Sequence, residues 1–299
     1  MIVDIADLDV IYLSFDEPLA EEFWAQINAM VPWAKRVHGI RGFDAAHKAA
    51  AAVSDTDRFV LIDGDNIPDD DFFNQQLRLT PINEGHVFRW KARNIINGLC
   101  YGNGGISCWT KKFVEEMRSH EAAIDTSDLK NSVEFCWNDG YVAMHNIYST
   151  TYPNGSKYQA WKAGYREGVK LSLNQGSYPQ SIKSVHPENL DRLMKWLTIG
   201  QDVDNGIYAI VGAHMGVLDV SNKSHTDISE FSDLLDHYTS FRIETEDSVE
   251  QLKSMREELR VREGLEIPDL NAMQSWFFKS FIKEEPNRDI MLTEVEARK

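Results

Sequence analysis

Several features that would place the chain in a special class of protein are scarce or missing from its 299 residues. The three cysteines, Cys100, Cys108 and Cys136, are an odd number without metal-type spacing, which favours reduced thiols over a disulfide framework. Apolar runs never approach the ~20 residues that a membrane span needs. The first residues lack the basic start and apolar centre of a signal peptide. We therefore expect a globular cytoplasmic protein that does not enter a membrane.

Basic residues are also few, since 31 Lys and Arg stand against 47 Asp and Glu, and the net charge is −16. This balance argues against simple nonspecific binding of nucleic acid. Residues 85–200 are the exception, because 14 basic and 10 acidic residues give that range a net charge of +4, whereas the remainder carries −20. The middle third is therefore where we expect an anionic substrate to bind, although an acidic surface elsewhere also serves solubility.

The most informative stretch is 58–66, where the apolar run Phe59-Val60-Leu61-Ile62 leads directly into Asp63-Gly64-Asp65. An apolar run of this length predicts a strand buried on both faces, as in a parallel sheet. The two carboxylates then fall at the carboxyl end of the strand, where open α/β sheets bind ligands. Because carboxylate oxygens are hard ligands, the pair suits a divalent cation that also holds a diphosphate.

The residues before this strand predict two strand–helix pairs. The expected elements are a strand at 9–15, a helix at 21–30, a strand at 34–40 and an alanine-rich helix at 45–53 that Asp44 caps. The resulting β-α-β-α-β order indicates an α/β fold with a mostly parallel sheet flanked by helices.

Downstream, the pattern predicts strands at 85–91 and 141–148, a glycine-rich loop at 97–105, and helices at 111–120, 158–173, from 186 onward and at 246–262. The apolar segment 207–212 fits either a strand or a helix. We expect one α/β domain over residues 1–225 and a helical C-terminal extension over residues 226–299.

The β-α-β-α-β start, the alanine-rich helix and the Asp63-Gly64-Asp65 turn together resemble the nucleotide-sugar glycosyltransferases of the GT-A fold, whose sheet is Rossmann-like. The amino-acid sequence from Trp33 through Asp44-Ala45-Ala46-His47-Lys48 to Asn66 is similar to that of glycosyltransferases of large tailed bacteriophages. Members of that group add sugars to hydroxymethylated pyrimidines in phage DNA, including arabinose onto hydroxymethylcytosine. The resemblance implies a UDP-sugar donor, Mn²⁺ or Mg²⁺ as cofactor, and a place in the host cytoplasm.

The resemblance also implies roles for individual residues. Asp65 is expected to bind the metal directly, and Asp63 to contact the ribose or a metal-bound water. A third metal ligand in this fold is often a late histidine, and His214 ranks ahead of the other candidates, His145 and His186.

Further residues are candidates for the remaining parts of a donor site. Asp16 and Asp44 follow predicted strands at the same edge and are candidates for uracil and ribose, while Lys48 lies one turn on and suits phosphate. An inverting enzyme also needs a general base for the acceptor hydroxyl. Asp139 is the first candidate and Glu134 the alternative; a retaining enzyme would need neither, and an ordinary turn explains Asp139-Gly140 almost as well.

Cations in the middle third form two candidate anion-binding groups. Lys162, Arg166 and Lys170 recur every four residues, so they share one face of the helix predicted at 158–173. Arg166 is assigned to the donor phosphates, and the other two to a nucleic-acid backbone. Arg89 and Lys91 add charge beside Trp90, which is assigned to stacking on a base.

The sequence leaves several functions open. We expect a metal-dependent glycosyltransferase that moves a sugar from a UDP-sugar to a hydroxymethylated base in DNA. The alternatives are a GT-A enzyme with a protein or glycan acceptor, a noncatalytic nucleotide-sugar or nucleic-acid binding module, and a nucleotidyltransferase, which also uses paired carboxylates on a sheet.

Overall fold

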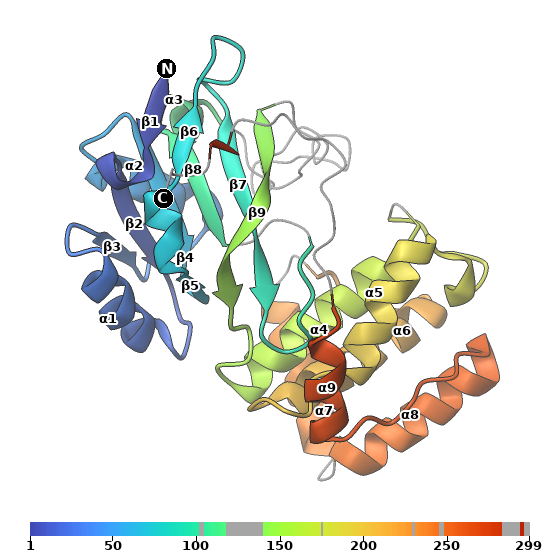
Figure 1. Cartoon of the computed structure of the whole chain (residues 1–299). Helices are drawn as coiled ribbons and strands as arrows, with labels where there is room; N and C mark the ends of the chain where they lie inside the picture. Colours follow the sequence, from blue (N-terminus) through green and yellow to red (C-terminus); the bar gives the residue numbers. More distant parts are fainter. Residues whose placement is uncertain are drawn as a thin grey trace. The chain divides into compact units, whose positions relative to one another are not determined.

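The computed structural model describes residues 1–101, 105–117, 140–174, 176–228, 231–244, 248–282 and 294–295. The chain forms two compact units (Figure 1). The first comprises Met1–Arg93, Cys100–Thr151 and Glu284–Lys299, and the second comprises Asn94–Leu99 and Tyr152–Lys283. None of the helices in the described part of the chain combines the length and apolarity that a bilayer crossing requires.

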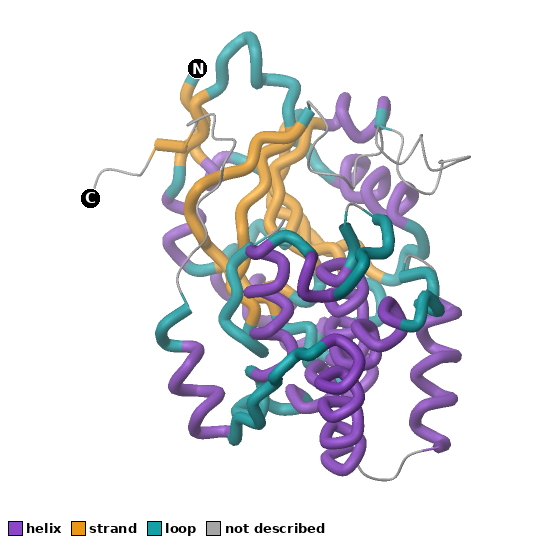
Figure 2. Tube along the Cα trace, turned by 90° about the vertical axis from the view of Figure 1, so that its right-hand side faces the viewer, coloured by secondary structure: helices purple, strands orange, loops and turns teal. Residues whose placement is uncertain are grey.

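The main sheet of the first unit has the strand order β3-β2-β4-β8-β7-β9-β5 (Figure 2, orange). Its strands are β2 (Asp9–Ser14), β3 (Lys35–His38), β4 (Arg58–Asp63), β5 (Asn66–Pro68), β7 (Val87–Asn94), β8 (Ile106–Thr110) and β9 (Tyr141–Thr151). The β2 strand pairs in parallel with β3 and β4, whereas β4 with β8, β8 with β7 and β9 with β5 pair antiparallel. The sheet is therefore mixed, and the predicted β-α-β-α-β order up to β4 is confirmed.

A second, small sheet has the order β1-β6-β10, formed by β1 (Ile2–Asp4), β6 (Gln76–Arg78) and β10 (Glu294–Val295). The 3₁₀ turns η1 (Ile5–Asp7) and η2 (Asp70–Asn74) adjoin it in sequence. These strands have two or three residues each, which is too short for a hydrophobic period to identify them in the sequence.

Helices α1 (Ala20–Met30), α2 (Phe43–Val53) and α3 (Lys111–Glu116) complete the first unit. The alanines of α2 and the apolar end of α3 pack with apolar residues of β2, β3, β4, β7 and β8 in one cluster: Ile11, Val37, Ala50, Ala51, Phe59, Leu61, Val87, Trp109, Val114 and Met117. All of β4 except its last residue is buried, as the sequence predicts. This burial fixes the strand that carries the acidic turn.

The second unit is helical. It contains α4 (Lys157–Ser172), the 3₁₀ turn η5 (Ile182–Ser184), α5 (Pro187–Thr198), α6 (Gly206–Ser221), α7 (Phe231–Glu244), α8 (Ser248–Glu263) and α9 (Ala272–Lys279). The ambiguous segment 207–212 lies in α6 and is therefore helical. It shows no clear period because α6 is apolar and buried on most of its surface.

Glycines allow α4 and α6 to pack at backbone contact. A Cβ on Gly164 would lie 1.9 Å from the carbonyl oxygen of Ala209, and one on Gly212 would lie 2.1 Å from that of Trp161. The contacts are reciprocal, since each helix brings a glycine against the backbone of the other. Gly168 and Gly216, one turn further along their helices, make the same kind of approach. The two helices therefore pack closely because glycine has no side chain at the contact points, as in other helix interfaces made of small residues.

We predict that Gly212→Ala destabilises the protein by about 3 kcal/mol, because the new methyl group meets backbone that cannot rotate away. In an unconstrained helix the same change would stabilise by about 1 kcal/mol. Urea denaturation followed by circular dichroism measures the difference. Gly85→Ala is the matched control, since a Cβ on Gly85 meets no atom within 4 Å. Equal stabilities of the two variants would refute the packing argument.

Candidate functional site

The acidic turn lies where the sequence predicts it, at the carboxyl end of β4 and before β5. Asp63 is the last residue of β4 and is exposed, whereas the five residues before it are buried. Asp65 is half-buried and its carboxylate is held on both oxygens. The Asn66 side-chain amide donates to Oδ1 at 3.1 Å, and the Thr151 hydroxyl donates to Oδ2 at 3.1 Å. The structure therefore fixes the orientation of Asp65 from two strands, β5 and β9.

Two glycines bring neighbouring chain segments against this turn. A Cβ on Gly105 would lie 2.0 Å from the Asn66 amide nitrogen and 3.1 Å from the Asp63 Cβ. The amide of Asp63 donates to the Gly105 carbonyl at 2.8 Å. Gly64 makes a similar approach, and its carbonyl accepts a 2.8 Å hydrogen bond from the buried Tyr12 hydroxyl. A side chain at either position would displace the side chain that now lies against it, which is Glu17 at Gly64 and Asn66 at Gly105.

A third carboxylate, Glu17, joins the pair. A Cβ on Gly64 would lie only 2.5 Å from Oε2 of Glu17, so this side chain lies directly against the turn. The amide of Phe15 donates to the same oxygen at 2.7 Å and holds the carboxylate in place. The sequence offered a signal, since Asp16-Glu17 follows β2 at the same sheet edge. Asp16, which the sequence predicts for the uracil or ribose, is exposed, and no contact among the described residues joins it to the turn.

The pKa values of two of these carboxyl groups, Asp63 and Glu17, are raised. Burial is the largest cause that raises the pKa of Asp63 to about 7, followed by the charge of Asp65, while Arg89 lowers it. Burial likewise raises the pKa of Glu17, and the charge of Asp65 adds to the rise. Asp63 nevertheless keeps exposed surface, so water reduces the effect of burial. The direction follows from the neighbouring carboxylates alone, and the site carries more negative charge than its surroundings compensate.

This donor set fits a divalent cation that arrives with a substrate. Within the described residues, no three His, Cys, Asp or Glu side chains converge as a complete metal site. Mg²⁺ and similar ions are often held by only one or two carboxylates together with substrate phosphates and water. Asp63 and Asp65 supply that number of hard oxygen ligands, and excess negative charge favours a cation.

Arg89 is the cation whose charge acts on Asp63 of the acidic turn. It lowers the pKa of Asp63, and its guanidinium lies over the Tyr141 ring at 5.1 Å from the centroid. Its Nε is buried and makes no hydrogen bond. The neighbouring Trp90 has no exposed surface and packs edge-on against Phe72 at 5.0 Å, so it cannot stack on a base as predicted; Lys91 is buried too.

The start of α2 differs from the prediction. The N-cap is Gly42, at φ 98°, and it makes no side-chain cap, so Asp44 is not the capping residue. Asp44 lies in the first turn of α2 and pairs with Lys48 at 3.0 Å. The predicted phosphate ligand Lys48 is exposed and shares its charge with this carboxylate.

The cations predicted to form one stripe do share α4, which belongs to the second unit. Each also has a contact within that unit. Lys170 pairs with Glu167 at 2.5 Å, Arg166 donates from Nε to the Ile228 carbonyl at 3.1 Å, and Lys162 lies over the Tyr158 ring. The half-buried Lys162 and Arg166 are thus tied into the helical unit.

The candidate third metal ligands have separate surroundings. His214 has no exposed surface within α6, and its Nδ1 donates to the Ile210 carbonyl at 2.8 Å. Burial lowers its pKa to about 4, so the ring is neutral. His186 caps α5 by accepting from the amide of Glu188, and His145 is exposed on β9. The proposed general bases Glu134 and Asp139 lie outside the described residues.

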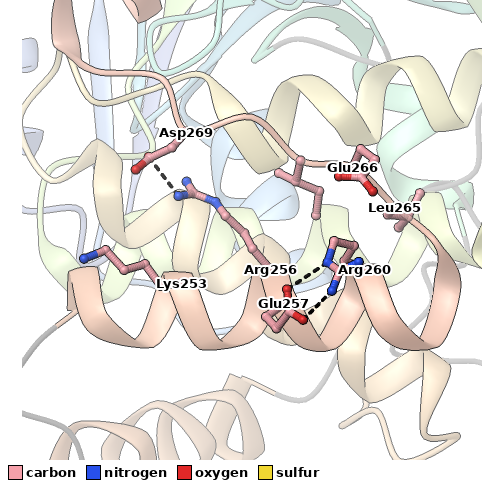
Figure 3. Close-up of a pocket in the computed structure, with 8 residues that line it drawn as sticks. Lys253, Arg256, Glu257, Arg260, Leu265, Glu266 and Asp269 are labelled. Atoms are coloured by element: carbon pink, nitrogen blue, oxygen red, sulfur yellow. Dashed lines mark hydrogen bonds and ion pairs between the residues drawn. The ribbon is translucent and has the colours of Figure 1, made fainter.

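A pocket of about 300 Å³ adjoins α8 in the second unit (Figure 3). Arg256 and Arg260 line it and are already paired, with Asp269 at 2.8 Å and with Glu257 at 2.6 Å. Nε and Nη2 of Arg256 are buried without partners, so they do not face the opening. The pocket is balanced in charge, and we assign no ligand to it.

No protein-family model, curated protein or solved structure matches this chain. The interpretation of the site therefore rests on the geometry of Asp63, Asp65, Glu17 and Arg89.

We predict that Asp63→Asn stabilises the metal-free protein at pH 8. Because folding raises the pKa of Asp63, its contribution to stability is lost as pH rises from about 4 toward about 7. A neutral amide escapes this loss, so the variant should be more stable than the wild type by about 1 kcal/mol at pH 8, a value reduced for solvent screening. Urea denaturation at pH 5 and pH 8 in the presence of a chelator measures it.

Asp70→Asn is the control for that experiment, because Asp70 is an exposed carboxylate on η2. It should change stability equally at both pH values. An Asp63→Asn variant that is less stable than the wild type at pH 8 without metal would show that repulsion among the carboxylates does not govern the turn.

We also predict that His214→Gln flattens the pH dependence of stability between pH 6.5 and pH 4. A buried neutral histidine favours folding fully above its unfolded pKa of 6.5, and this contribution is lost as pH falls to about 4. The wild type should lose about 3 kcal/mol through this residue. The free energy of unfolding across that range measures it, with exposed His145→Gln as the control. An unchanged slope would contradict neutral burial of His214.

Proposed function

We propose that this protein is a metal-dependent glycosyltransferase of GT-A type that uses a UDP-sugar. The observation that carries the proposal is the cluster of Asp63, Asp65 and Glu17 at the carboxyl end of a buried central strand. A cluster with unneutralised negative charge at such an edge favours a divalent cation with an anionic ligand. The resemblance of about residues 8–215 to GT-A enzymes supplies the substrate class.

Sugar transfer requires stabilisation of the diphosphate that leaves. Mn²⁺ or Mg²⁺ bound here would supply that stabilisation as a Lewis acid. Asp65 is suited to hold the ion because Asn66 and Thr151 fix its carboxylate. Asp63 and Glu17 would add ligand oxygens or hold metal-bound water. Thus the carboxylates share one task, which is to position a cation against a diphosphate.

Arg89 is suited to the diphosphate itself. Its guanidinium charge acts on Asp63. Arginine binds phosphate oxygens through a planar set of donors, and charge-assisted bonds of this kind are strong. We therefore assign Arg89 to the leaving diphosphate rather than to a nucleic-acid backbone.

The remaining donor contacts stay as the sequence predicts them. Asp16 and Asp44 are proposed for the uracil and ribose, with Lys48 beside them. If the enzyme inverts the sugar carbon, Asp139 is proposed as general base, with Glu134 as the alternative.

For the acceptor we propose a hydroxymethylated pyrimidine in DNA, on the resemblance to phage enzymes. The burial of Trp90 removes the predicted stacking residue, so the proposal for DNA relies on that resemblance and on the basic residues of α4. A protein or glycan acceptor would leave the donor chemistry unchanged.

The proposal predicts Mn²⁺-dependent transfer when the protein is incubated with a panel of UDP-sugars and DNA that contains hydroxymethylcytosine. Mass spectrometry of the digested nucleosides should show a hexose or pentose added to the modified base. Asp65→Asn should lower the rate at least ~100-fold, because it removes a metal ligand, and Arg89→Gln should also lower it at least ~100-fold.

Asp70→Asn should retain wild-type activity. UDP release without a change in DNA mass would keep the glycosyltransferase and exclude DNA as acceptor. A nucleotide adduct in place of a glycoside would identify a nucleotidyltransferase. Mn²⁺-dependent binding of UDP-sugars without turnover on DNA, protein or glycan acceptors would identify a binding module, and transfer by Asp65→Asn at the wild-type rate would exclude this turn as the active site.

A further inference from the structure

The last described helix, α9, is drawn in red in Figure 1. Large apolar side chains on and just after this helix are exposed. Among the described residues of the second unit, most of the exposed large hydrophobic side chains lie within 273–281: Met273, Trp276, Phe277, Phe278 and Phe281. Trp276 is 65% exposed and Phe281 is 63% exposed. Phe277 contacts Phe281 at 4.8 Å between ring centroids. We call these five exposed residues together the α9 face.

The opposite side of α9 is polar and anchored. Ser275 is fully buried, and its hydroxyl accepts from the Gly200 amide at 3.4 Å. One turn later, Lys279 pairs with Asp202 at 2.5 Å, and both side chains are at least 85% buried. Lys279 also donates to the Ile95 carbonyl at 3.0 Å. A capping box between Asn271 and Gln274 fixes the start of the helix.

The helix α9 is therefore amphipathic, with its polar side toward the protein and its apolar side toward solvent. Ser275 and Lys279 are four residues apart and face the helical unit, whereas Met273, Trp276 and Phe277 follow the i, i+3, i+4 spacing of the outward side. A surface helix normally directs its apolar stripe toward the core. The buried contacts of Ser275 and Lys279 hold α9 in the opposite orientation. The aromatic side chains are therefore kept at the surface by specific contacts on the other side of the helix.

The α9 face is large for a surface that meets only water. From typical areas of aromatic side chains and the exposed fractions, it offers about 600 Å². That value is at the upper end for the largest apolar patch of a monomer and approaches the ~800 Å² that each partner contributes to a stable interface. Its area is sufficient for association with another protein surface.

The charges around α9 limit the choice of partner. The one cation in the helix, Lys279, is committed to Asp202, so the face offers no neutralisation of phosphate. A net charge of −16 further opposes approach to DNA or an anionic membrane. The same net charge opposes a second copy, but the helix of that copy brings no free charge into the contact and offers an apolar area of the same size about a twofold axis.

We propose that two copies of this chain associate through the α9 face, with Trp276, Phe277 and Phe281 at the centre. The inference does not use the sugar chemistry, so it stands or falls separately from the proposed function. Repulsion between two acidic chains opposes the contact, and salt should strengthen it by screening.

Sedimentation equilibrium of the full chain tests the proposal. The wild type should form dimers with a Kd in the micromolar range or tighter, and this Kd should fall when salt rises from 0.05 to about 0.5 M. Trp276→Ala and Phe281→Ala should each raise the Kd at least ~30-fold, because both remove a central aromatic anchor. Phe281 lies beyond the end of α9, so its variant leaves the helix and its anchors unchanged.

Val261→Ala is the matched control, since Val261 is an exposed apolar residue on α8, outside the α9 face. It should dimerise as the wild type does. A wild type that stays monomeric at about 100 µM would overturn the proposal. So would a dimer that survives both aromatic substitutions. A monomer that loses DNA or vesicle binding with Trp276→Ala would assign the face to that ligand instead.

Discussion

Charge placed at the end of a buried strand is the constraint on which the first unit depends. The β4 strand is enclosed by neighbours on both edges and by apolar layers on its faces, so Asp63 is the first of its residues to reach solvent. At this point Asp63 lies near Asp65 and Glu17. Hydrogen bonds from Tyr12, Asn66 and Thr151 hold the turn in place. The sheet therefore contributes stability, and the turn opposes it in the absence of a cation.

Glycines allow close approach of other atoms to the backbone in both units, but the groups that approach differ. In the first unit, Gly64 and Gly105 admit Glu17 and Asn66 to the turn and thereby concentrate polar groups. In the second unit, Gly164 and Gly212 admit carbonyl groups of the facing helix and thereby create a tight apolar contact. A methyl group at any of these positions would collide with an atom closer than 3 Å. The sequence shows these glycines, but only the structure identifies the atom that each one accommodates.

The parts of the fold with a strong local period could be predicted. The strands β2 and β4 and the helix α4 lie close to their expected bounds, because apolar period and burial agree there. Pairing could not be predicted, since an antiparallel β8 beside β4 is decided by contacts distant in the sequence. The burial of Trp90 had no local signal, because the same residues fit an exposed edge or a central strand.

At the site, the sequence predicted the acidic pair Asp63 and Asp65 but did not predict that Glu17 lies against their turn. Asp16 and Glu17 are adjacent in the sequence, so the local backbone decides which of the two side chains points toward Gly64. The residue types alone do not predict that direction. The sequence predicted Arg89 as a nucleic-acid contact within a basic zone. Its electrostatic effect on Asp63 could not be predicted, because it depends on the fold.

The acidic character of the whole chain bears on how the proposed donor would bind. A nucleoside diphosphate carries negative charge, and so do the turn and the protein around it. Three carboxylates outnumber the single charge of Arg89 that acts on Asp63, so under the proposed function a diphosphate without a cation would be repelled. Its binding would become favourable when a cation accompanies or precedes it. Under the proposed function, the same crowding that destabilises the empty turn would therefore make binding of the donor conditional on the metal.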